Sequence, residues 1–198
     1  MLLPYFSLFA QEEDIEQDEI QDEPHIESDW IHFDTDLYTR GDKNFVITLG
    51  VILPAFFAGN IDDQGHGLSV GGTGSLAFNY FLGPNLFIGG EFSGMFAGTR
   101  GENMLFMIPF GLRIGYQFLW RRFEFPISLM IGGVPTRKLE EGYFGFIMKP
   151  GASAFWRFNP DWSFGLNTVW WFVPQWPKDG KNAYGNFIEL TVSARYHF

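Results

Sequence analysis

The feature that most constrains the fold of this chain is an alternation of apolar and polar residues with a period of two. The alternation begins at residue 44 and recurs, in separate stretches, up to the C-terminus. In the final stretch, for example, Leu190 and Val192 alternate with Thr191 and Ser193. A period of two is that of a β-strand, in which successive side chains point to opposite faces. We therefore predict an all-β protein.

The alternating stretches number eight, and the connections between them differ in length in a regular way. We predict strands over residues 45–53, 68–82, 86–96, 106–120, 123–131, 144–158, 162–172 and 188–198. Short connections at 83–85, 121–122 and 159–161 alternate with longer ones at 54–67, 97–104, 133–143 and 174–186. In an antiparallel up-and-down sheet, this order places all the tight turns at one end and all the longer connections at the other.

The two faces of the predicted strands differ in content, and this difference decides which face is inside. One face is crowded with large apolar side chains, in a chain that has 24 Phe and 7 Trp. The other face is small or polar, as at Ser75, Ala77 and Asn79. Because eight strands enclose an interior that side chains just fill, the bulky face must point outward. That is the arrangement of a membrane barrel, so we predict an eight-stranded antiparallel up-and-down transmembrane β-barrel over residues 44–198.

Aromatic residues of the predicted outer face gather near both ends of the strands. Two aromatic girdles, one at each interface with water, are typical of membrane barrels. The predicted interface residues, which would contact membrane lipid, are Tyr80, Tyr116, Trp120, Trp156, Trp162, Trp170, Tyr196 and Phe198.

The C-terminal residues add a second indication. Tyr196 and the terminal Phe198 resemble the C-terminal signature of bacterial outer-membrane proteins. With the strand count and the girdles, residues 44–198 resemble the small eight-stranded outer-membrane barrels (OmpX, the OmpA barrel and OmpW). This resemblance implies a location in the bacterial cell outer membrane and recognition of Phe198 by the barrel assembly machinery. The OmpW-like proteins further suggest a narrow conduit for small or hydrophobic solutes.

Three prolines depart from this pattern. Pro109, Pro126 and Pro150 fall within the fourth, fifth and sixth predicted strands. Because proline cannot donate a hydrogen bond to the ladder, we expect bulges or strand ends there.

The N-terminal part of the chain differs from the rest. Residues 1–10 are apolar and resemble the end of a signal peptide. Residues 11–43 form an acidic segment, in which residues 11–36 carry 12 Asp and Glu and no Lys or Arg. We expect this segment to lie beside the tight turns, on the periplasmic side, as a tether or as a plug of the barrel mouth. Its acidity argues against binding to nucleic acid.

Charged residues on the predicted inner face form the candidate functional site. Because lone charges in a narrow interior are costly, we expect them to pair. Glu91 and Arg113 lie at similar heights on neighbouring strands and are the first predicted pair. The alternatives are a packing network that fills the barrel and a gate in a narrow conduit. The residues are Glu91, Arg113, Glu124, Lys149, Arg157, Glu189 and Arg195.

No pattern in the sequence indicates catalysis, a cofactor or a metal. The chain has no Cys, and the His and acidic residues between His25 and Asp36 match no closed metal site. His66 lies near Asp62 and Ser69, but no oxyanion donor is apparent. We therefore predict that the protein is not an enzyme and uses no cofactor.

Two functional hypotheses remain. The first is a conduit for small or hydrophobic solutes, which would enter between the longer connections. The second is a plugged barrel that serves adhesion or envelope integrity through those connections. The apolar residues predicted to line the mouth, or to anchor the outer interface, are Phe56, Phe57, Val134, Pro135, Tyr143, Pro174, Trp176 and Pro177.

Overall fold

The computed structural model describes residues 38–59, 68–99, 104–138, 141–175 and 183–198. Residues 1–10, nearly all of the acidic segment, the His66 region, Trp176 and Pro177 lie outside the described residues. Within the described part of the chain, no helix is long and apolar enough to cross a membrane.

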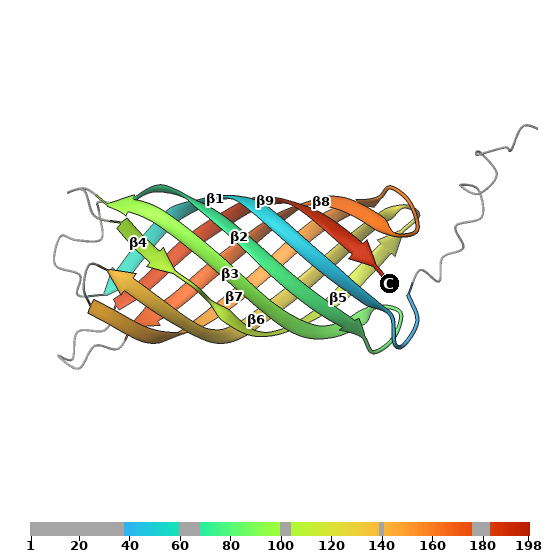
Figure 1. Ribbon diagram of the computed structural model, residues 1–198, viewed down its shortest axis with the longest axis horizontal. Coiled ribbons are helices and arrows are strands. Elements are labelled where there is room, and N and C mark those ends of the chain that lie inside the picture. Colours follow the sequence, from blue (N-terminus) through green and yellow to red (C-terminus); the bar gives the residue numbers. More distant parts are fainter. Residues whose placement is uncertain (1–37, 60–67, 100–103, 139–140, 176–182) are drawn as a thin grey trace, which may run out of the picture. The chain divides into compact units, whose positions relative to one another are not determined.

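The described residues form one antiparallel sheet of nine strands (Figure 1). The strands are β1 (Lys43–Gly59), β2 (Leu68–Phe81), β3 (Leu86–Thr99), β4 (Met104–Met107), β5 (Phe110–Trp120), β6 (Phe123–Lys138), β7 (Glu141–Arg157), β8 (Trp162–Gln175) and β9 (Ala183–His197). Apart from β4 and β5, strands that are neighbours in the chain pair with each other, and β1 also pairs with β9, which closes the sheet. Because β4 and β5 both pair with β3 and with β6, they share one position. The barrel is therefore eight-stranded, as predicted.

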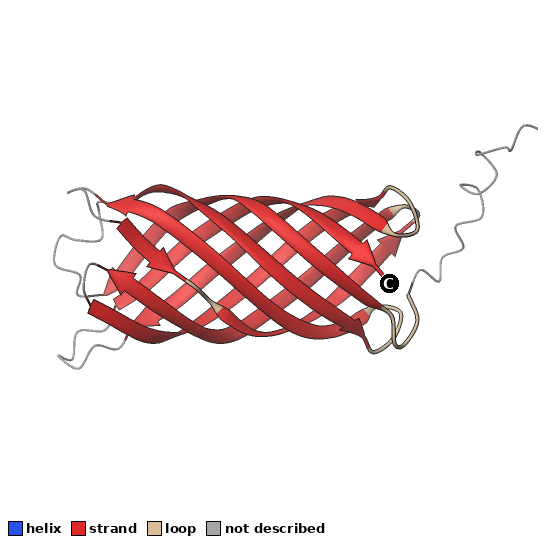
Figure 2. Cartoon of the chain, in the orientation of Figure 1, coloured by secondary structure: helices blue, strands red, loops and turns tan. Residues whose placement is uncertain are grey.

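The tight turns and the C-terminus lie at one end of the barrel, called here the tight-turn end (Figure 2). The turns separate β2 from β3, β5 from β6, and β7 from β8. The longer connections are shorter than predicted, because β1, β6 and β8 continue to Gly59, Lys138 and Gln175. Backbone pairing continues there although the apolar alternation has ended. The apolar residues predicted for the longer connections therefore lie in strands, apart from the two outside the described residues.

The three prolines affect the strands differently. Pro109 separates β4 from β5, as expected. The wall stays hydrogen-bonded there, because the Ser93 amide donates to the Pro109 carbonyl (2.8 Å) and the Ile108 amide donates to the Pro135 carbonyl (3.1 Å). At Pro126 and Pro150, the expected bulges are absent from the described ladders, which each skip two pairs and resume in the same register. A register shift occurs instead between Pro54 and Phe56.

The apolar face of the sheet points outward. Exposed large apolar residues occur on all nine strands, and Leu112, for example, is 75% exposed. A continuous apolar belt of this kind is stable in lipid rather than in water, which confirms the predicted orientation of the two faces. All eight predicted interface aromatics are exposed on this surface; their place at the membrane interface stays a prediction.

Glycines admit large rings into the wall of the barrel. Gly115 on β5 lies directly opposite Phe87 on β3, and a Cβ atom at Gly115 would overlap the Phe87 ring and the Ile127 carbonyl oxygen. Gly72 lies opposite Phe96 in the same relation. Such glycine and aromatic pairs fix the register of neighbouring strands.

Candidate functional site

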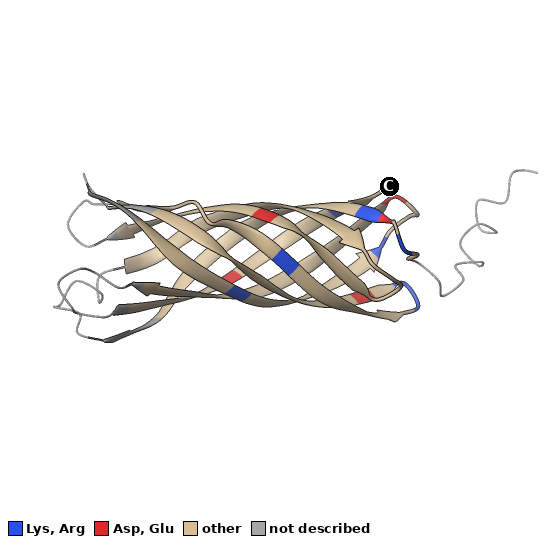
Figure 3. Ribbon diagram, turned by 90° about the horizontal axis from the view of Figure 1, so that it is seen from below, with Lys and Arg blue, Asp and Glu red and all other residues tan. Residues whose placement is uncertain are grey.

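The interior of the barrel has three layers along its axis. The mouth cluster, at the tight-turn end, contains Tyr38, Glu124, Arg157, Arg195 and His197. The central charged layer contains Glu91, Arg113, Lys149 and Glu189. The distal cluster, toward the opposite end, contains Ile52, Met95, Ala97, Met107, Met130, Val134, Ile147, Trp171, Val173 and Phe187. Figure 3 shows charged residues in the middle of the barrel and at the tight-turn end.

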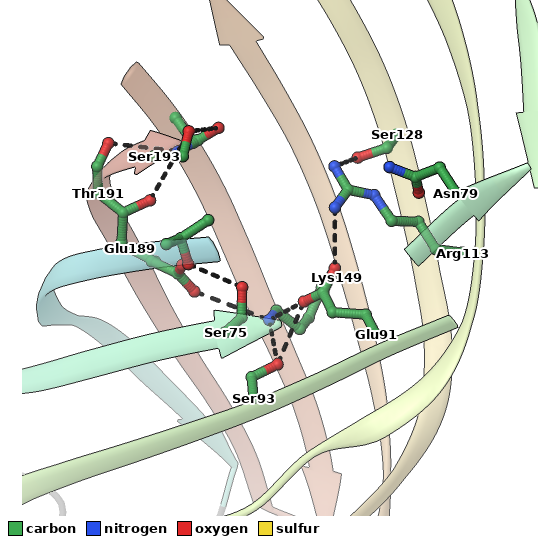
Figure 4. Close-up of polar contacts among 12 residues, drawn as sticks. Ser75, Asn79, Glu91, Ser93, Arg113, Ser128, Lys149, Glu189, Thr191 and Ser193 are labelled. Atoms are coloured by element: carbon green, nitrogen blue, oxygen red, sulfur yellow. Dashed lines mark hydrogen bonds and ion pairs between the residues drawn. The ribbon is translucent and has the colours of Figure 1, made fainter. Parts of the chain in front are cut away.

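The central charged layer joins β3, β5, β7 and β9 across the interior (Figure 4). Glu91 and Arg113 form an ion pair, with 3.3 Å between Oε2 and Nη1. Lys149 Nζ lies 2.5 Å from Glu91 Oε1 and 3.8 Å from Glu189 Oε2, and it donates to Ser93 Oγ (2.8 Å). Two carboxylates thus meet two cations, so the layer is neutral. Whether these residues act as a gate stays a prediction.

Trp171 connects the central charged layer to the distal cluster. Its Nε1 donates to Glu189 Oε2 (2.5 Å), and Lys149 Nζ lies 4.3 Å from the centre of its ring. Lys149, Glu189 and Trp171 are each at most 2% exposed. A buried ammonium is thus compensated by carboxylates on one side and by an aromatic face on another.

The mouth cluster is built around Glu124, which is 0% exposed. Its carboxylate pairs with Arg195 (2.5 Å) and with Arg157 (3.4 Å). Arg195 also donates to Gln117 Oε1 (2.9 Å), and its guanidinium lies 3.7 Å from the centre of the Phe155 ring. One carboxylate and two guanidinium groups give this cluster a net positive charge.

Tyr38 is the residue of the mouth cluster that the sequence did not indicate. It precedes β1, yet its side chain enters the tight-turn end and is 2% exposed. Its hydroxyl donates to Glu124 Oε2 (2.8 Å) and lies 3.1 Å from His197 Nδ1. Burial raises the pKa of Tyr38 to about 12. The sequence signal for Tyr38 is that an aromatic residue comes just before the first strand, at the end of the barrel where the mouth must close.

His197 continues this hydrogen-bonded chain to Ser163. The Ser163 hydroxyl lies 2.8 Å from His197 Nε2, a spacing that also occurs between a nucleophile and its base. Ser163 is fully buried, so a substrate cannot reach its hydroxyl in this arrangement. The contact therefore orients His197 toward Tyr38.

The distal cluster corrects the prediction that the whole inner face is small or polar. Val134, predicted for a longer connection, lies in β6 and is buried in this cluster at 0% exposure. The sequence is apolar on both faces in this region, as in the run Val169–Pro174. Alternation cannot reveal which residues face inward in such a run, and this is why the cluster was missed.

Comparisons with known proteins agree with this architecture. A protein-family model matches residues 17–196. An uncharacterized protein of Treponema pallidum (strain Nichols) is 32% identical over 101 residues, which are 50% of this chain and 46% of the relative. The match therefore spans about half the length of that relative.

Three solved structures share the fold at low sequence identity. Neisserial surface protein A has a TM-score of 0.59 and 9% identity, over 80% of this chain and 97% of that chain. The outer membrane protein OprG from Pseudomonas aeruginosa has a TM-score of 0.56 and 9% identity, over 81% and 97%. The N-terminal β-barrel domain of Pseudomonas aeruginosa OprF has a TM-score of 0.50 and 10% identity, over 81% and 100%. The apolar outer surface and these matches show that the fold is that of the small eight-stranded outer-membrane β-barrels. Because the family model covers residues 17–196, the chain belongs to the family that this model describes.

Proposed function

We propose that the barrel binds small apolar solutes in the distal cluster and releases them sideways through its wall. One observation carries the proposal: the interior of this membrane barrel is apolar in its distal part, although barrel interiors are typically polar. An apolar inner surface has no charged or hydrogen-bonding groups that could bind an ion or a sugar. It matches the chemistry of a solute that is poorly soluble in water.

The central charged layer argues against passage along the full axis. An apolar solute would have to separate Lys149 from Glu91 and Glu189. Breaking a buried ion pair costs about 3–5 kcal/mol, and the mouth cluster lies beyond. A solute held in the distal cluster therefore leaves more easily through the wall of the barrel than through the central charged layer.

One strand of the wall is interrupted next to the distal cluster, where β4 ends and β5 begins, although backbone hydrogen bonds to the neighbouring strands continue there. Met107, a member of the cluster, is the last residue of β4, and β5 begins at Phe110. Pro109 lacks an amide hydrogen, so the ladder has one donor fewer here. This interruption is the exit that the proposal assigns.

The distal cluster is closely packed, and its methionines provide the means to admit a solute. Met95, Met107 and Met130 are all almost fully buried. Unbranched thioether side chains adapt to irregular spaces at little cost. Rotation of these three side chains would make room for a small ring.

Methyl NMR of the barrel in micelles tests solute binding. With 13C-labelled methionine methyl groups, titration with naphthalene should shift the signals of Met95, Met107 and Met130 in a saturable way. Met104 faces outward and is 62% exposed, so its signal should change only in proportion to naphthalene in the micelle. Equal, unsaturable shifts at all four positions would contradict the proposal.

Vesicle uptake tests the exit. Pro109→Ala restores a donor at the interruption and should slow entry of naphthalene into the lipid of reconstituted vesicles. Pro126→Ala makes the same change within β6, where the strand is continuous, and should leave the rate unchanged. Equal rates for both variants and the wild type would exclude exit at Pro109.

The second candidate is a plugged barrel that acts through its longer connections. The near-zero exposure of the distal side chains favours it, because such packing also describes a core that only stabilises the fold. Replacing residues 60–67 with a short Gly-Ser connection should then abolish binding to a surface partner while the barrel still folds. The methyl titration separates the two candidates, since a plugged barrel gives no saturable shift.

A further inference from the structure

We propose that the tight-turn end contains a binding site for a phenol ring, and that Tyr38 is its resident ligand, supplied by the chain itself. The site lies across the central charged layer from the distal cluster. It does not depend on the proposed binding of apolar solutes.

The apolar part of this site fits the face of a ring. The Tyr38 ring stacks on Phe81, with 4.0 Å between centroids and 15° between planes. Phe87 contacts Phe81 at 5.6 Å, and Leu119 packs against the same group. Arg157 lies 5.5 Å from the centre of the Tyr38 ring. A flat aromatic ring is therefore held between an apolar face and a cation.

The polar part of the site distinguishes a phenol from an apolar ring. The Tyr38 hydroxyl donates to Glu124 Oε2 at 2.8 Å. It also lies 3.1 Å from His197 Nδ1. With Nδ1 protonated, that nitrogen donates to the hydroxyl, while Nε2 accepts from Ser163 Oγ (2.8 Å). Arg195 Nη1 also donates to the hydroxyl, at 3.5 Å. Two donors and one acceptor thus converge on a single oxygen, and a hydroxyl satisfies all three.

The ring and the pocket belong to different parts of the structure. The pocket is formed by β2, β3, β5, β6, β7 and β9, whereas Tyr38 lies outside every strand, since β1 begins at Lys43. The segment is held by hydrogen bonds from the Gly41 amide to the Phe81 carbonyl (3.0 Å) and from the Phe81 amide to the Asp42 carbonyl (2.9 Å). Tyr38 can therefore leave without breaking the ladder that closes the barrel.

Because the Tyr38 ring is not part of the barrel wall, a phenol from outside can take its place. A tyrosine side chain presented by another protein, or a free phenol, would compete with Tyr38 for the same contacts. Binding of such a ligand would displace the Tyr38 side chain, which attaches the acidic N-terminal segment to the barrel. The ligand class is therefore a phenol, either as a small molecule or as a tyrosine side chain.

Replacing Tyr38 with Ala in the full-length chain tests the site directly. The barrel is refolded in micelles, and its unfolding midpoint is measured with increasing 4-methylphenol. A ligand that binds only the folded state raises that midpoint, so we expect a saturable rise for Tyr38→Ala. The rise should be smaller with toluene, which lacks the hydroxyl. The wild type, whose site is occupied, should respond least. A folded Tyr38→Ala variant that shows no saturable rise would overturn the proposal.

A second measurement on the wild type covers the case in which Tyr38→Ala does not fold. Chymotrypsin cleaves after exposed tyrosines, and a docked Tyr38 should be cut at least about tenfold more slowly than in the unfolded chain. Saturating 4-methylphenol should accelerate that cut by displacing the ring, whereas toluene should do so less. Rapid cleavage after Tyr38 in the folded barrel, or cleavage insensitive to 4-methylphenol, would refute the site.

Discussion

Replacing Lys149 with Met tests whether the central charged layer stabilises the barrel through charge pairing. Lys149 is 2% exposed and lies between Glu91 and Glu189. Met is similar in length, so the change removes the charge with little loss of volume. Glu91 keeps its ion pair with Arg113, while Glu189 keeps the hydrogen bond from Trp171 but loses its contact with the ammonium. Removing one partner of a buried ion pair costs about 3–5 kcal/mol, because the other charge is left uncompensated.

The assay is unfolding by urea in micelles, followed by the difference in gel mobility between folded and unfolded barrel. We expect the free energy of unfolding to fall by about 3–5 kcal/mol for Lys149→Met. Adding Glu189→Gln to this variant should recover part of the loss, because it removes the uncompensated carboxylate. Lys43→Met, at an exposed lysine, should change the free energy by less than about 0.5 kcal/mol. A loss below about 1 kcal/mol, or one that Glu189→Gln does not reduce, would refute pairing as the source of stability.

Three further predictions concern other parts of the barrel. Gly115→Ala should lower the free energy of unfolding by about 1–3 kcal/mol, because its Cβ overlaps the Phe87 ring; urea unfolding measures this, and recovery in Gly115→Ala with Phe87→Leu would identify the clash. Phe198→Ala should reduce folded barrel in the outer membrane of cells while refolding in micelles is unchanged; equal loss in both would assign Phe198 to stability rather than to assembly. The pKa of Tyr38 is raised from 10.0 to about 12. Its contribution to the free energy of unfolding is therefore complete below pH 10 and is lost as pH rises through about 12. By linkage this amounts to about 3 kcal/mol; urea unfolding of the wild type should show the loss, and Tyr38→Phe should lack it.

The sequence was sufficient for the barrel itself, because one physical rule governs most of its strands. Narrow barrels in lipid need large apolar side chains outside and small or polar ones inside, and alternation records that rule directly. The same counting along strands placed Glu91 and Arg113 side by side, and the structure joins them by an ion pair. Contacts between neighbouring strands are therefore accessible to sequence reasoning wherever the register follows from tight turns.

Contacts across the interior are not accessible in this way. Lys149 on β7 reaches Glu91 on β3, and Arg195 on β9 reaches Glu124 on β6, so each pair depends on side-chain length and on barrel diameter. Tyr38 precedes all strands and obeys no alternation. The distal cluster lies where both faces are apolar, so the pattern carries no information about direction.

The strand ends were misjudged for a related reason. Hydrophobic alternation reports contact with lipid, whereas a strand continues as long as its backbone finds partners. β6 and β7 remain paired as far as Lys138 and Glu141, beyond the last regular alternation. At Pro126 and Pro150 the ladders each skip two pairs without a change of register, because the remaining pairs of these long strands fix the alignment.

The central charged layer has a physical reason to lie between two sites of opposite character. The distal cluster excludes charge, while the mouth cluster carries a net positive charge around Glu124. Lys149 and Trp171 separate them, because the ammonium lies against the ring on one side and against two carboxylates on the other. An apolar solute that moved Trp171 would also remove the indole hydrogen bond from Glu189. Entry from the distal cluster toward the mouth is therefore opposed by the same contacts that stabilise the layer, and the two proposed sites are expected to bind their ligands independently.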